Sequence, residues 1–318
     1  MFKDGLMKRN LFESPKMAIL IAIFCNLLWG TAFPTIKVGY ELFAIGDSAS
    51  SKILFAGIRF FLSGLMLVAY HFATTKKMPT IRKQNYQWVL ALALVQTTAQ
   101  YFFAYLGVAN TTGASATIFS SLSACYAVVL AHFFLKNDRL TTQKVVGSLV
   151  CVFGIFVSTL GDGTIHFSLN GEGMLLISQL CFAIGSVFNK KITQTDGPLA
   201  VTSYNLTLGG LVLIIIGLGG GGKLSTVSIS GLLILLYLAV LSALAFTLWS
   251  QVLKYHPVGK ISVFTFIVPI AGTLFSALVL GEDIMHIKYP ISLLLVTLGI
   301  YTIHRRKKAG INSVVLPR

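Results

Sequence analysis

Long apolar stretches, separated by short polar ones, follow one another along almost the whole chain. Ten of these stretches are long enough to cross a hydrocarbon core of about 30 Å as a helix. Inside lipid the backbone must satisfy its own hydrogen bonds, so helices are the expected form. The pattern predicts helices at 17–40, 52–73, 87–108, 110–135, 142–160, 171–192, 199–217, 229–251, 257–280 and 288–304.

The composition agrees with a chain that lies mostly in lipid. Hydrophobic residues make up 55% of the 318 residues and charged residues 11%, and the mean hydropathy is +0.80. Soluble domains carry about 25% charged residues, so most of this chain does not face water. A net charge of +15 would suggest a nucleic-acid partner in a soluble protein. Here the basic residues fall between the apolar stretches, which favours cytoplasmic loops and no nucleic-acid partner.

The basic residues also predict the orientation of the chain. Cytoplasmic loops of membrane proteins are enriched in lysine and arginine. With a cytoplasmic N-terminus, all but five of the 25 lysines and arginines fall on the cytoplasmic side of the ten predicted helices. The pattern predicts a multi-pass membrane protein with both termini in the cytoplasm. The five exceptions are Lys37, Lys52, Arg59, Lys223 and Lys288.

The two halves of the chain resemble each other weakly. Residues 104–135 align with 250–281 at an offset of 146 (250 minus 104). A second alignment, at an offset of 153 (179 minus 26), places 26–30 over 179–183 and Lys37 over Lys190. Each half then holds five helices, and an odd number turns the second half upside down in the membrane. Inverted repeats are typical of secondary transporters, in which two halves rock about a site near the middle of the membrane.

Four short sequences, taken together, point to a known family. In order, they are Asn26-Leu27-Leu28-Trp29-Gly30-Thr31-Ala32-Phe33 with Ile36-Lys37, Ile58-Arg59-Phe60, Val268-Pro269-Ile270, and Leu280-Gly281-Glu282. They resemble the first, second and ninth helices of the EamA-type drug/metabolite transporters and the loop after the ninth. The resemblance covers about residues 17–305, which is nearly the whole chain.

The resemblance implies an all-α integral membrane protein with ten transmembrane helices in two inverted five-helix repeats around a central cavity. Such proteins export or exchange amino acids, metabolites and drugs, and the resemblance implies a location in the cell (inner) membrane. The chain departs from the family pattern in the fourth helix, where Ser123 replaces a proline and Leu135-Lys136 replaces Gly-Glu. The expected division is a cytoplasmic tail at 1–16, a first repeat at 17–160, a second, inverted repeat at 161–305 and a basic cytoplasmic tail at 306–318.

The acidic residues are informative because none lies in the middle of a predicted helix. An intramembrane carboxylate is the usual relay for protons or sodium, and membrane enzymes that handle diphosphates need acidic clusters as metal ligands. We therefore expect a neutral, polar and aromatic cavity without a metal or cofactor. A membrane enzyme acting on a lipid or prenyl substrate is the alternative. Histidine remains as a titrating group, and His132 is the candidate for coupling, with a place at the membrane interface as the alternative.

Polar and aromatic side chains recur at helical spacing in several of the predicted helices. Such faces must point toward other helices or toward a water-filled cavity, because unpaired amides in lipid are costly. They could hold helices together or bind a small-molecule substrate. Pro269 removes a backbone hydrogen bond and is a candidate gate hinge. The candidate substrate-binding residues are Asn26, Trp29, Gln96, Gln100, Tyr101, Gln179, Phe182, Phe246, Trp249, Thr265 and Phe266.

Two basic side chains lie within predicted helices, and their roles stay open. Lys37 is near the outer end of the first helix, where its stem can reach the interface. Arg59 is about two turns into the second helix and could bond a neighbouring helix. If either faces the cavity, it favours an anionic or zwitterionic substrate. Small residues at Gly147 and Gly154 could pack the fifth helix within one subunit or in a homodimer.

Overall fold

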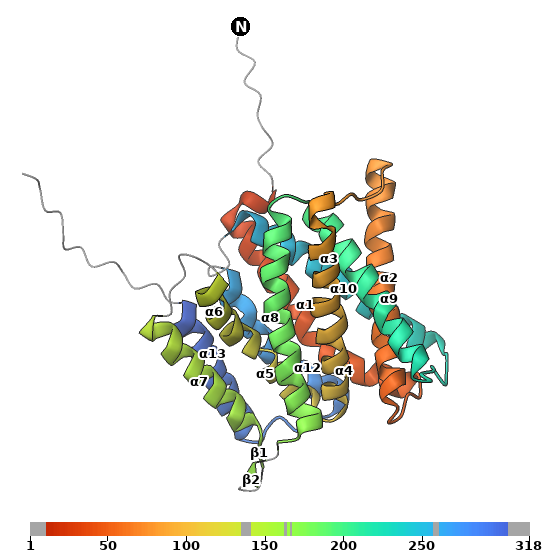
Figure 1. The fold of residues 1–318 in the computed structure, drawn as a ribbon. Helices are drawn as coiled ribbons and strands as arrows, with labels where there is room; N and C mark the ends of the chain where they lie inside the picture. Colours follow the sequence, from red (N-terminus) through yellow and green to blue (C-terminus); the bar gives the residue numbers. More distant parts are fainter. Residues whose placement is uncertain (1–10, 135–140, 162–163, 166, 257–260, 305–318) are drawn as a thin grey trace, which may run out of the picture.

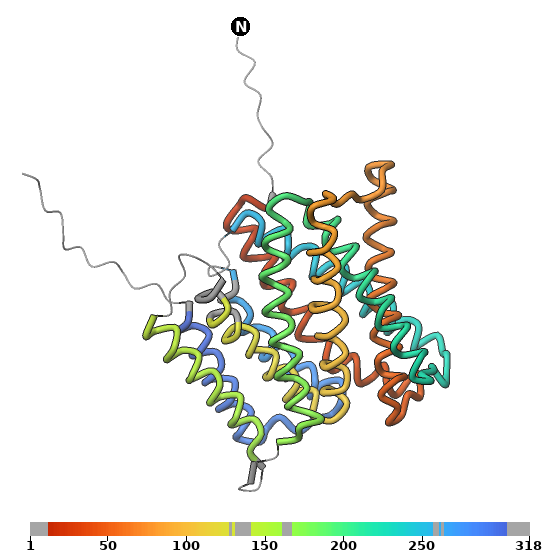
Figure 2. Tube along the Cα trace, viewed as in Figure 1, coloured from red at the N-terminus to blue at the C-terminus, as the bar shows by residue number. Residues whose placement is uncertain are grey.

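The computed structural model describes residues 11–134, 141–161, 164–165, 167–256 and 261–304, which form a bundle of helices (Figures 1 and 2). The His132 backbone belongs to a helix, but its side chain is outside the described part, as are the tails at 1–10 and 305–318. The one described strand pair is an antiparallel hairpin of β1 (Leu160–Gly161) and β2 (Thr164–Ile165).

The first half of the chain begins with a 3-10 turn, η1 (Leu11–Glu13), followed by α1 (Pro15–Leu42) and α2 (Ala49–Thr75). A continuous helical run then contains a π-helical segment, η3 (Ala93–Ala99), between α3 (Tyr86–Leu92) and α4 (Gln100–Ala109). The remaining elements are η2 (Lys83–Asn85), α5 (Gly113–Phe119), α6 (Leu122–Phe134) and α7 (Thr142–Ser158).

The second half begins with a π-helical turn, η4 (Leu169–Gly173), which leads into α8 (Met174–Thr193). Two long helices follow, α9 (Pro198–Gly219) and α10 (Ile229–Tyr255). A 3-10 segment, η5 (Ser262–Phe266), leads into α12 (Ile267–Leu280), and α13 (Lys288–His304) ends the described chain. Each apolar stretch of the sequence therefore contains a helix.

The ends of the helices follow from local sequence. The side chains of Ser48, Thr112 and Ser228 each accept a hydrogen bond from a backbone N–H in the first turn of α2, α5 and α10. These bonds satisfy donors that have no partner inside the helix. Pro198 begins α9, where its missing N–H costs nothing. Gly281 ends α12 in the left-handed region, with φ of 64°.

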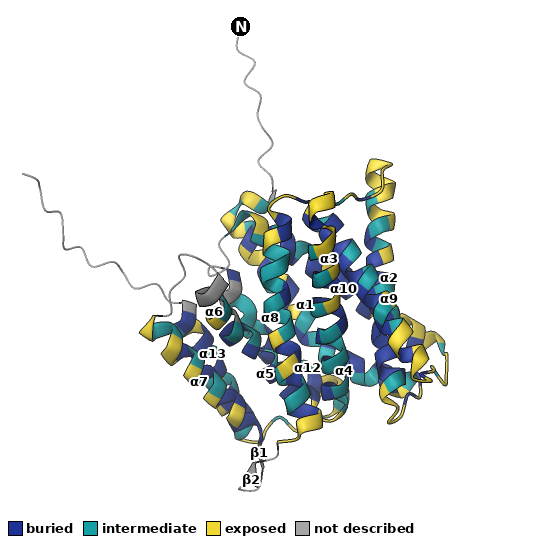
Figure 3. Cartoon of the chain, in the orientation of Figure 1, coloured by how far each residue is buried: buried dark blue, intermediate teal, exposed yellow. Residues whose placement is uncertain are grey.

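The surface of the bundle is apolar where it faces outward. Six helical segments are long and apolar enough to cross a membrane, namely 15–42, 49–75, 83–109, 169–193, 198–219 and 229–255. The shorter apolar helices expose large hydrophobic side chains, including Leu149 (64%), Phe153 (62%) and Leu278 (83%), and Figure 3 shows such exposed positions along their length. A water-soluble monomer does not expose so much apolar surface. The chain is a multi-pass membrane protein.

Glycines bring α2 and α9 into close contact. Gly57 and Gly64 in α2 are spaced like Gly210 and Gly217 in α9, and the two pairs differ by 153 (210 minus 57, and 217 minus 64). A Cβ atom at Gly57 would lie 2.6 Å from the Ile214 backbone nitrogen, and one at Gly217 would lie 2.7 Å from the Leu54 Cα. The contacts are reciprocal: Gly57 meets 213–214 and Gly210 meets 60–61, while Gly64 meets Thr207 and Gly217 meets Leu54.

The other helix pairs follow the same relation. Helix α1 of the first half packs against α10 and α12 of the second half. Helix α8, which occupies the equivalent place in the second half, packs against α4 and α6 of the first half. The pair α7 and α13 also meets closely, because Gly147 and Gly154 lie against the backbone of α13. These two glycines are therefore used within the subunit. The homodimer that they suggested stays a prediction.

Two apolar stretches are less regular than expected. The stretch 110–135 is interrupted at Ser120 and Ser121, which separate α5 from α6 without a proline. The stretch 257–280 consists of the 3-10 segment η5 followed by α12 in its described part. Pro269 is the third residue of α12, so the position expected in the middle of a helix is in its first turn. The fixed φ of proline suits a first turn, where the lost N–H is least costly.

Candidate functional site

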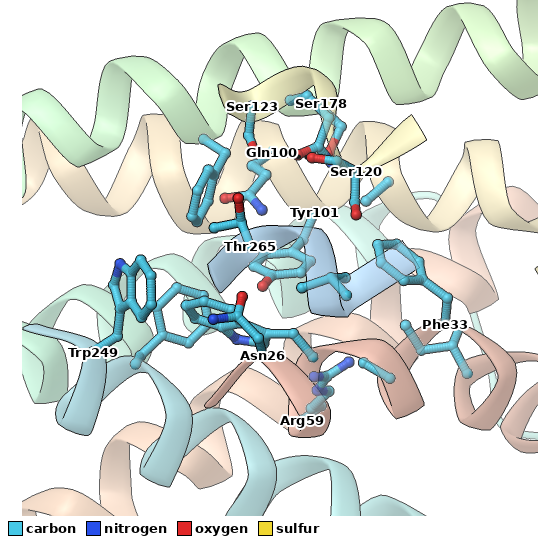
Figure 4. Close-up of a pocket in the computed structure, with 18 residues that line it drawn as sticks. Asn26, Phe33, Arg59, Gln100, Tyr101, Ser120, Ser123, Ser178, Trp249 and Thr265 are labelled. Carbon is cyan, nitrogen blue, oxygen red and sulfur yellow. Dashed lines mark hydrogen bonds between the residues drawn. The ribbon is translucent and has the colours of Figure 1, made fainter. Parts of the chain in front are cut away.

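A cavity lies between the two halves of the chain. It contains about 790 Å³ of space between atoms, part of which is open to solvent. Most of the predicted substrate-binding residues line it, and Figure 4 shows them converging from several helices. The predicted residues that line it are Asn26, Trp29, Gln100, Tyr101, Gln179, Phe182, Phe246, Trp249 and Thr265.

Aromatic rings form one wall of the cavity. The ring of Trp29 on α1 lies 5.2 Å from Trp249 and 5.7 Å from Phe246, both on α10, and 6.3 Å from Phe182 on α8. All three contacts are edge-to-face, a favourable geometry for aromatic pairs. Trp29 and Phe182 differ by 153, so equivalent positions of the two repeats meet at this wall. The wall can stack with a flat or apolar part of a ligand.

Polar groups occupy the side opposite to Asn26 and Arg59 (Figure 4). Gln100, Ser120, Ser123 and Ser178 gather there, with Tyr101 between the two sides. The amide nitrogen of Asn26 donates to the Ala22 carbonyl at 2.7 Å. Among the described residues, no hydrogen-bond partner is found for Asn26 Oδ1, Gln100 Oε1 or Ser178 Oγ. Buried polar atoms are normally paired, so these atoms are available to a ligand or to water.

Arg59 also lines the cavity, from α2. It is 2% exposed, and its Nε donates to the Leu238 carbonyl at 3.1 Å and to Ser242 Oγ at 3.0 Å. Its Nη1 donates to the Tyr105 hydroxyl at 3.0 Å. The sequence left two places open for Arg59, a bond to a neighbouring helix and a position facing the cavity. The side chain has both, because it bonds neighbouring helices and lines the cavity.

Gln96 does not line the cavity, although it was expected to share a face with Gln100. Its Oε1 accepts a hydrogen bond from Asn205 Nδ2 at 3.2 Å, and Thr97 donates to Asn205 Oδ1 at 2.9 Å. Gln96 and Thr97 both lie in the π-helical segment η3, which packs against α9. A π-helix bonds i to i+5 and so departs from the α-helical spacing that the prediction assumed. Gln96 joins η3 to α9 and does not line the cavity.

Other candidate residues have separate places. Phe266 packs against the main hydrophobic core and is not a lining residue. Pro269 is buried in the first turn of α12, next to the lining residue Val268. The role of Pro269 as a gate and of His132 in coupling stay predictions. Among the described residues no group of three His, Cys, Asp or Glu could hold a metal ion.

The sequence did not predict several lining residues. Ser178 is four residues before Phe182 on the same face of α8, which was a usable signal. Ser120 and Ser123 line the cavity because the chain breaks between α5 and α6, and helical periodicity does not predict that break. The lining residues that the sequence did not predict are Ala32, Phe33, Ile36, Ala104, Ser120, Ser123, Ser178 and Val268.

An aromatic cluster packs near one end of the bundle. Tyr40, Phe43, Phe55 and Tyr105 are buried, with ring centroids 5.4 to 6.2 Å apart for successive neighbours. The Tyr40 hydroxyl donates to the Tyr105 carbonyl at 2.8 Å. This cluster lies at the end that carries the loop between α1 and α2. The four rings therefore pack together in the core beside the cavity and do not line it.

An ion pair reinforces the same end. Lys37 Nζ is 3.8 Å from Glu282 Oε1, so Lys37 has an acidic partner and does not line the cavity. The Glu282 carboxylate also accepts from the Gly113 and Ala114 backbone N–H groups at 2.7 and 3.0 Å, and from Ser276 Oγ at 2.7 Å. A carboxylate at the first turn of α5 satisfies donors that the helix leaves unpaired. Glu282 thus ties α1, α5 and α12 together.

Replacing Glu282 by Gln is expected to lower the unfolding free energy by about 1–3 kcal/mol, because an amide cannot accept all of these bonds. The measurement is thermal unfolding of the purified protein in detergent. Asp283→Asn is the control, since Asp283 is exposed and the bond described for its carboxylate is local, from Met285 N at 2.9 Å. Equal melting temperatures for the two variants would show that the Glu282 contacts contribute nothing.

Comparison with known proteins identifies the family. The model of the EamA-like transporter family matches residues 16–160 and again residues 169–305. The uncharacterized inner membrane transporter YedA of Escherichia coli is 25% identical over 301 residues, covering 90% of this chain and 92% of that protein. A probable amino-acid metabolite efflux pump of Salmonella typhimurium is 25% identical over 279 residues, covering 83% and 87%.

Two further similarities are of different kinds. A WAT1-related chloroplastic protein of Arabidopsis thaliana is 28% identical over 277 residues, or 83% of this chain, which spans only 63% of that protein. A solved crystal structure has the same fold, with a TM-score of 0.68, 18% identity and coverage of 91% of this chain and 96% of the other.

The two family matches cover both halves of the chain and nearly all of its helices. The chain belongs to the EamA-like transporter family, within the drug/metabolite transporters. It is a transporter rather than an enzyme, and the alternative of a lipid- or prenyl-modifying enzyme is not supported.

Proposed function

We propose that the protein is a secondary transporter that moves small organic molecules, such as amino acids or drug-like compounds, by alternating access around the central cavity. The observation that carries the proposal is that both repeats contribute lining residues to the cavity. Those from the first repeat lie between Asn26 and Ser123, and those from the second lie between Ser178 and Val268. A site between two such halves can be exposed to either side when they rock. The name of the Salmonella relative, an amino-acid metabolite efflux pump, supports the same class of cargo.

The proposed topology has ten transmembrane helices in two inverted five-helix repeats, 17–160 and 161–305. The reciprocal contacts at an offset of 153 support a two-fold relation between the halves. The excess of lysine and arginine supports cytoplasmic tails at 1–16 and 306–318. The name of the Escherichia coli relative, an inner membrane transporter, supports an inner-membrane location. With the tails in the cytoplasm, the aromatic cluster and the Lys37–Glu282 pair lie at the outer end.

The proposed mode is exchange or facilitated diffusion. Among the described residues that line the cavity there is no Asp or Glu, so none of them offers a carboxylate to carry protons or sodium. The available polar groups are amides, hydroxyls and the Arg59 guanidinium. Substrate recognition then depends on hydrogen bonds and aromatic contacts.

Counterflow by the purified protein in liposomes tests the proposal. We expect saturable uptake of at least one compound from a panel of amino acids, organic acids, amines and nucleobases, without a pH gradient. Protein-free liposomes are the control. Uptake only with a pH gradient would contradict the uncoupled mode and point to His132. No uptake of any compound would overturn the proposed function.

A further inference from the structure

We propose that Arg59 makes the cavity selective for organic molecules that carry a carboxylate on an apolar or aromatic body. This inference rests on the proposed function and names the substrate class of the same cavity. It follows from three features of Arg59. No acidic side chain among the described residues pairs with it, some of its N–H groups have no described acceptor, and the equivalent position of the second repeat carries no arginine.

The guanidinium of Arg59 is buried without an opposite charge. All the acceptors described for it are neutral: a backbone carbonyl and two hydroxyls. Among the described residues, the ion pairs with an N–O distance up to 4.0 Å do not include Arg59. Taking a charge out of water without an opposite charge is unfavourable, and within membrane helices such charges usually mark a ligand path. A ligand carboxylate would supply the missing charge.

The guanidinium also keeps donors for a ligand. It has five N–H groups, and the described bonds use Nε and Nη1. No acceptor for Nη2 is found among the described residues. Neighbouring N–H groups of a guanidinium match the two oxygens of a carboxylate. The bonds to Leu238, Ser242 and Tyr105 fix the side chain, so that little order is lost on binding.

The repeat architecture does not require an arginine at this position. In the reciprocal contacts of α2 and α9, equivalent residues differ by 153, so the equivalent of Arg59 is residue 212. That residue is Val212 in α9. At the equivalent position of the second repeat, α9 therefore packs with the short apolar side chain of Val212 in place of an arginine. The charge is an addition to one half, which favours a role toward ligand over a role in packing.

The aromatic wall lies next to Arg59 through Tyr101. The ring of Tyr101 is 6.3 Å from that of Tyr105, whose hydroxyl accepts from Arg59, and 6.5 Å from that of Phe246. Phe246 in turn belongs to the wall around Trp29. A ligand with its acid group at Arg59 can therefore lay its body against these rings. The geometry selects an amphipathic monocarboxylate.

The test compares 3-phenylpropanoate with 3-phenylpropanamide, which differ only in the acid group. The full-length protein carries Trp88→Phe, which leaves Trp29 and Trp249 of the cavity wall as fluorescent reporters, since the chain has three tryptophans. Quenching titrations in detergent give the two dissociation constants. We expect the acid to bind about tenfold or more tightly than the amide, as a charge-assisted hydrogen bond implies.

Variants assign the preference to Arg59. Arg59→Gln is expected to bring the two dissociation constants within about twofold, whereas Arg59→Lys, which keeps the charge, retains part of the preference. Lys37→Gln is the matched control, because Lys37 already has Glu282 as its partner, and it should leave the preference unchanged. If Arg59→Gln does not fold, the comparison uses the ratio of the two dissociation constants in Arg59→Lys, Lys37→Gln and the parent. The proposal then requires a smaller preference for the acid in Arg59→Lys than in the other two proteins.

The proposal is overturned if the parent binds both probes equally or binds neither, or if Arg59→Gln retains the preference. It is also overturned if Lys37→Gln loses the preference to the same extent, because the effect would then reflect the general positive potential. These results are separate from the counterflow screen. Uptake of uncharged compounds alone would leave the transporter standing and remove the carboxylate selectivity.

Discussion

Replacing Gln100 and Gln179 together by leucine is expected to reduce counterflow at least about a hundredfold while the protein still folds. Both residues line the cavity, and Gln100 Oε1 has no partner among the described residues. A ligand that loses two hydrogen bonds to buried amides loses about 1–1.5 kcal/mol for each, and the leucines also leave its polar groups unpaired. Leucine is similar in size and suits an apolar surrounding, so the fold should be retained.

Gln251→Leu is the matched control for that double variant. It removes an amide from α10 that is not among the lining residues. Melting temperature and elution volume in detergent establish that all variants are folded. Normal counterflow by Gln100→Leu/Gln179→Leu would show that the ligand binds elsewhere, and the assignment of the site would be wrong.

Gly217→Ala is expected to lower the stability of the folded protein by about 1–3 kcal/mol, the usual cost of overpacking. The added Cβ atom would lie 2.7 Å from both the backbone nitrogen and the Cα of Leu54, neither of which can move without shifting α2. Gly219, two residues later in α9, has nothing within 4 Å of the same position. Thermal unfolding of Gly217→Ala and Gly219→Ala in detergent compares the two directly.

The pair isolates packing from helix propensity. Alanine is favoured over glycine in a helix by about 1 kcal/mol, so Gly219→Ala should be neutral or slightly stabilising. If Gly217→Ala and Gly219→Ala had the same melting temperature, α2 and α9 would not be as close as described. Gly64→Ala should behave like Gly217→Ala, because the two positions are equivalent in the repeats.

The sequence predicted the helices and the centre of the cavity well, because both depend on strong local signals. Apolar length identified the helices, and the need to hide amides and tryptophans from lipid brought Asn26, Trp29, Gln100 and Gln179 to one place. The alignment of the halves also paired Trp29 with Phe182, which meet in the wall. These features require only composition and helical spacing.

The remaining features depend on contacts between segments far apart in the sequence. The acidic partner of Lys37 is 245 residues away (282 minus 37), so no local pattern could reveal it. Arg59 was left between two roles because its surroundings come from α4 and α10. Gln96 was expected beside Gln100, but it meets Asn205, which is 109 residues away, and no local pattern could reveal that contact.

The π-helical segment at 93–99 also sets the direction in which the residues after it face. Wide turns of this kind hold about one more residue than an α-helical turn. If the same residues were wound as an ordinary α-helix, the following segment would be turned by about 100° relative to the preceding one. Gln100, Tyr101 and Ala104 would then leave the cavity together, while Trp88 and its neighbours stayed in place. The wide turn is therefore what aims these three lining residues at the cavity.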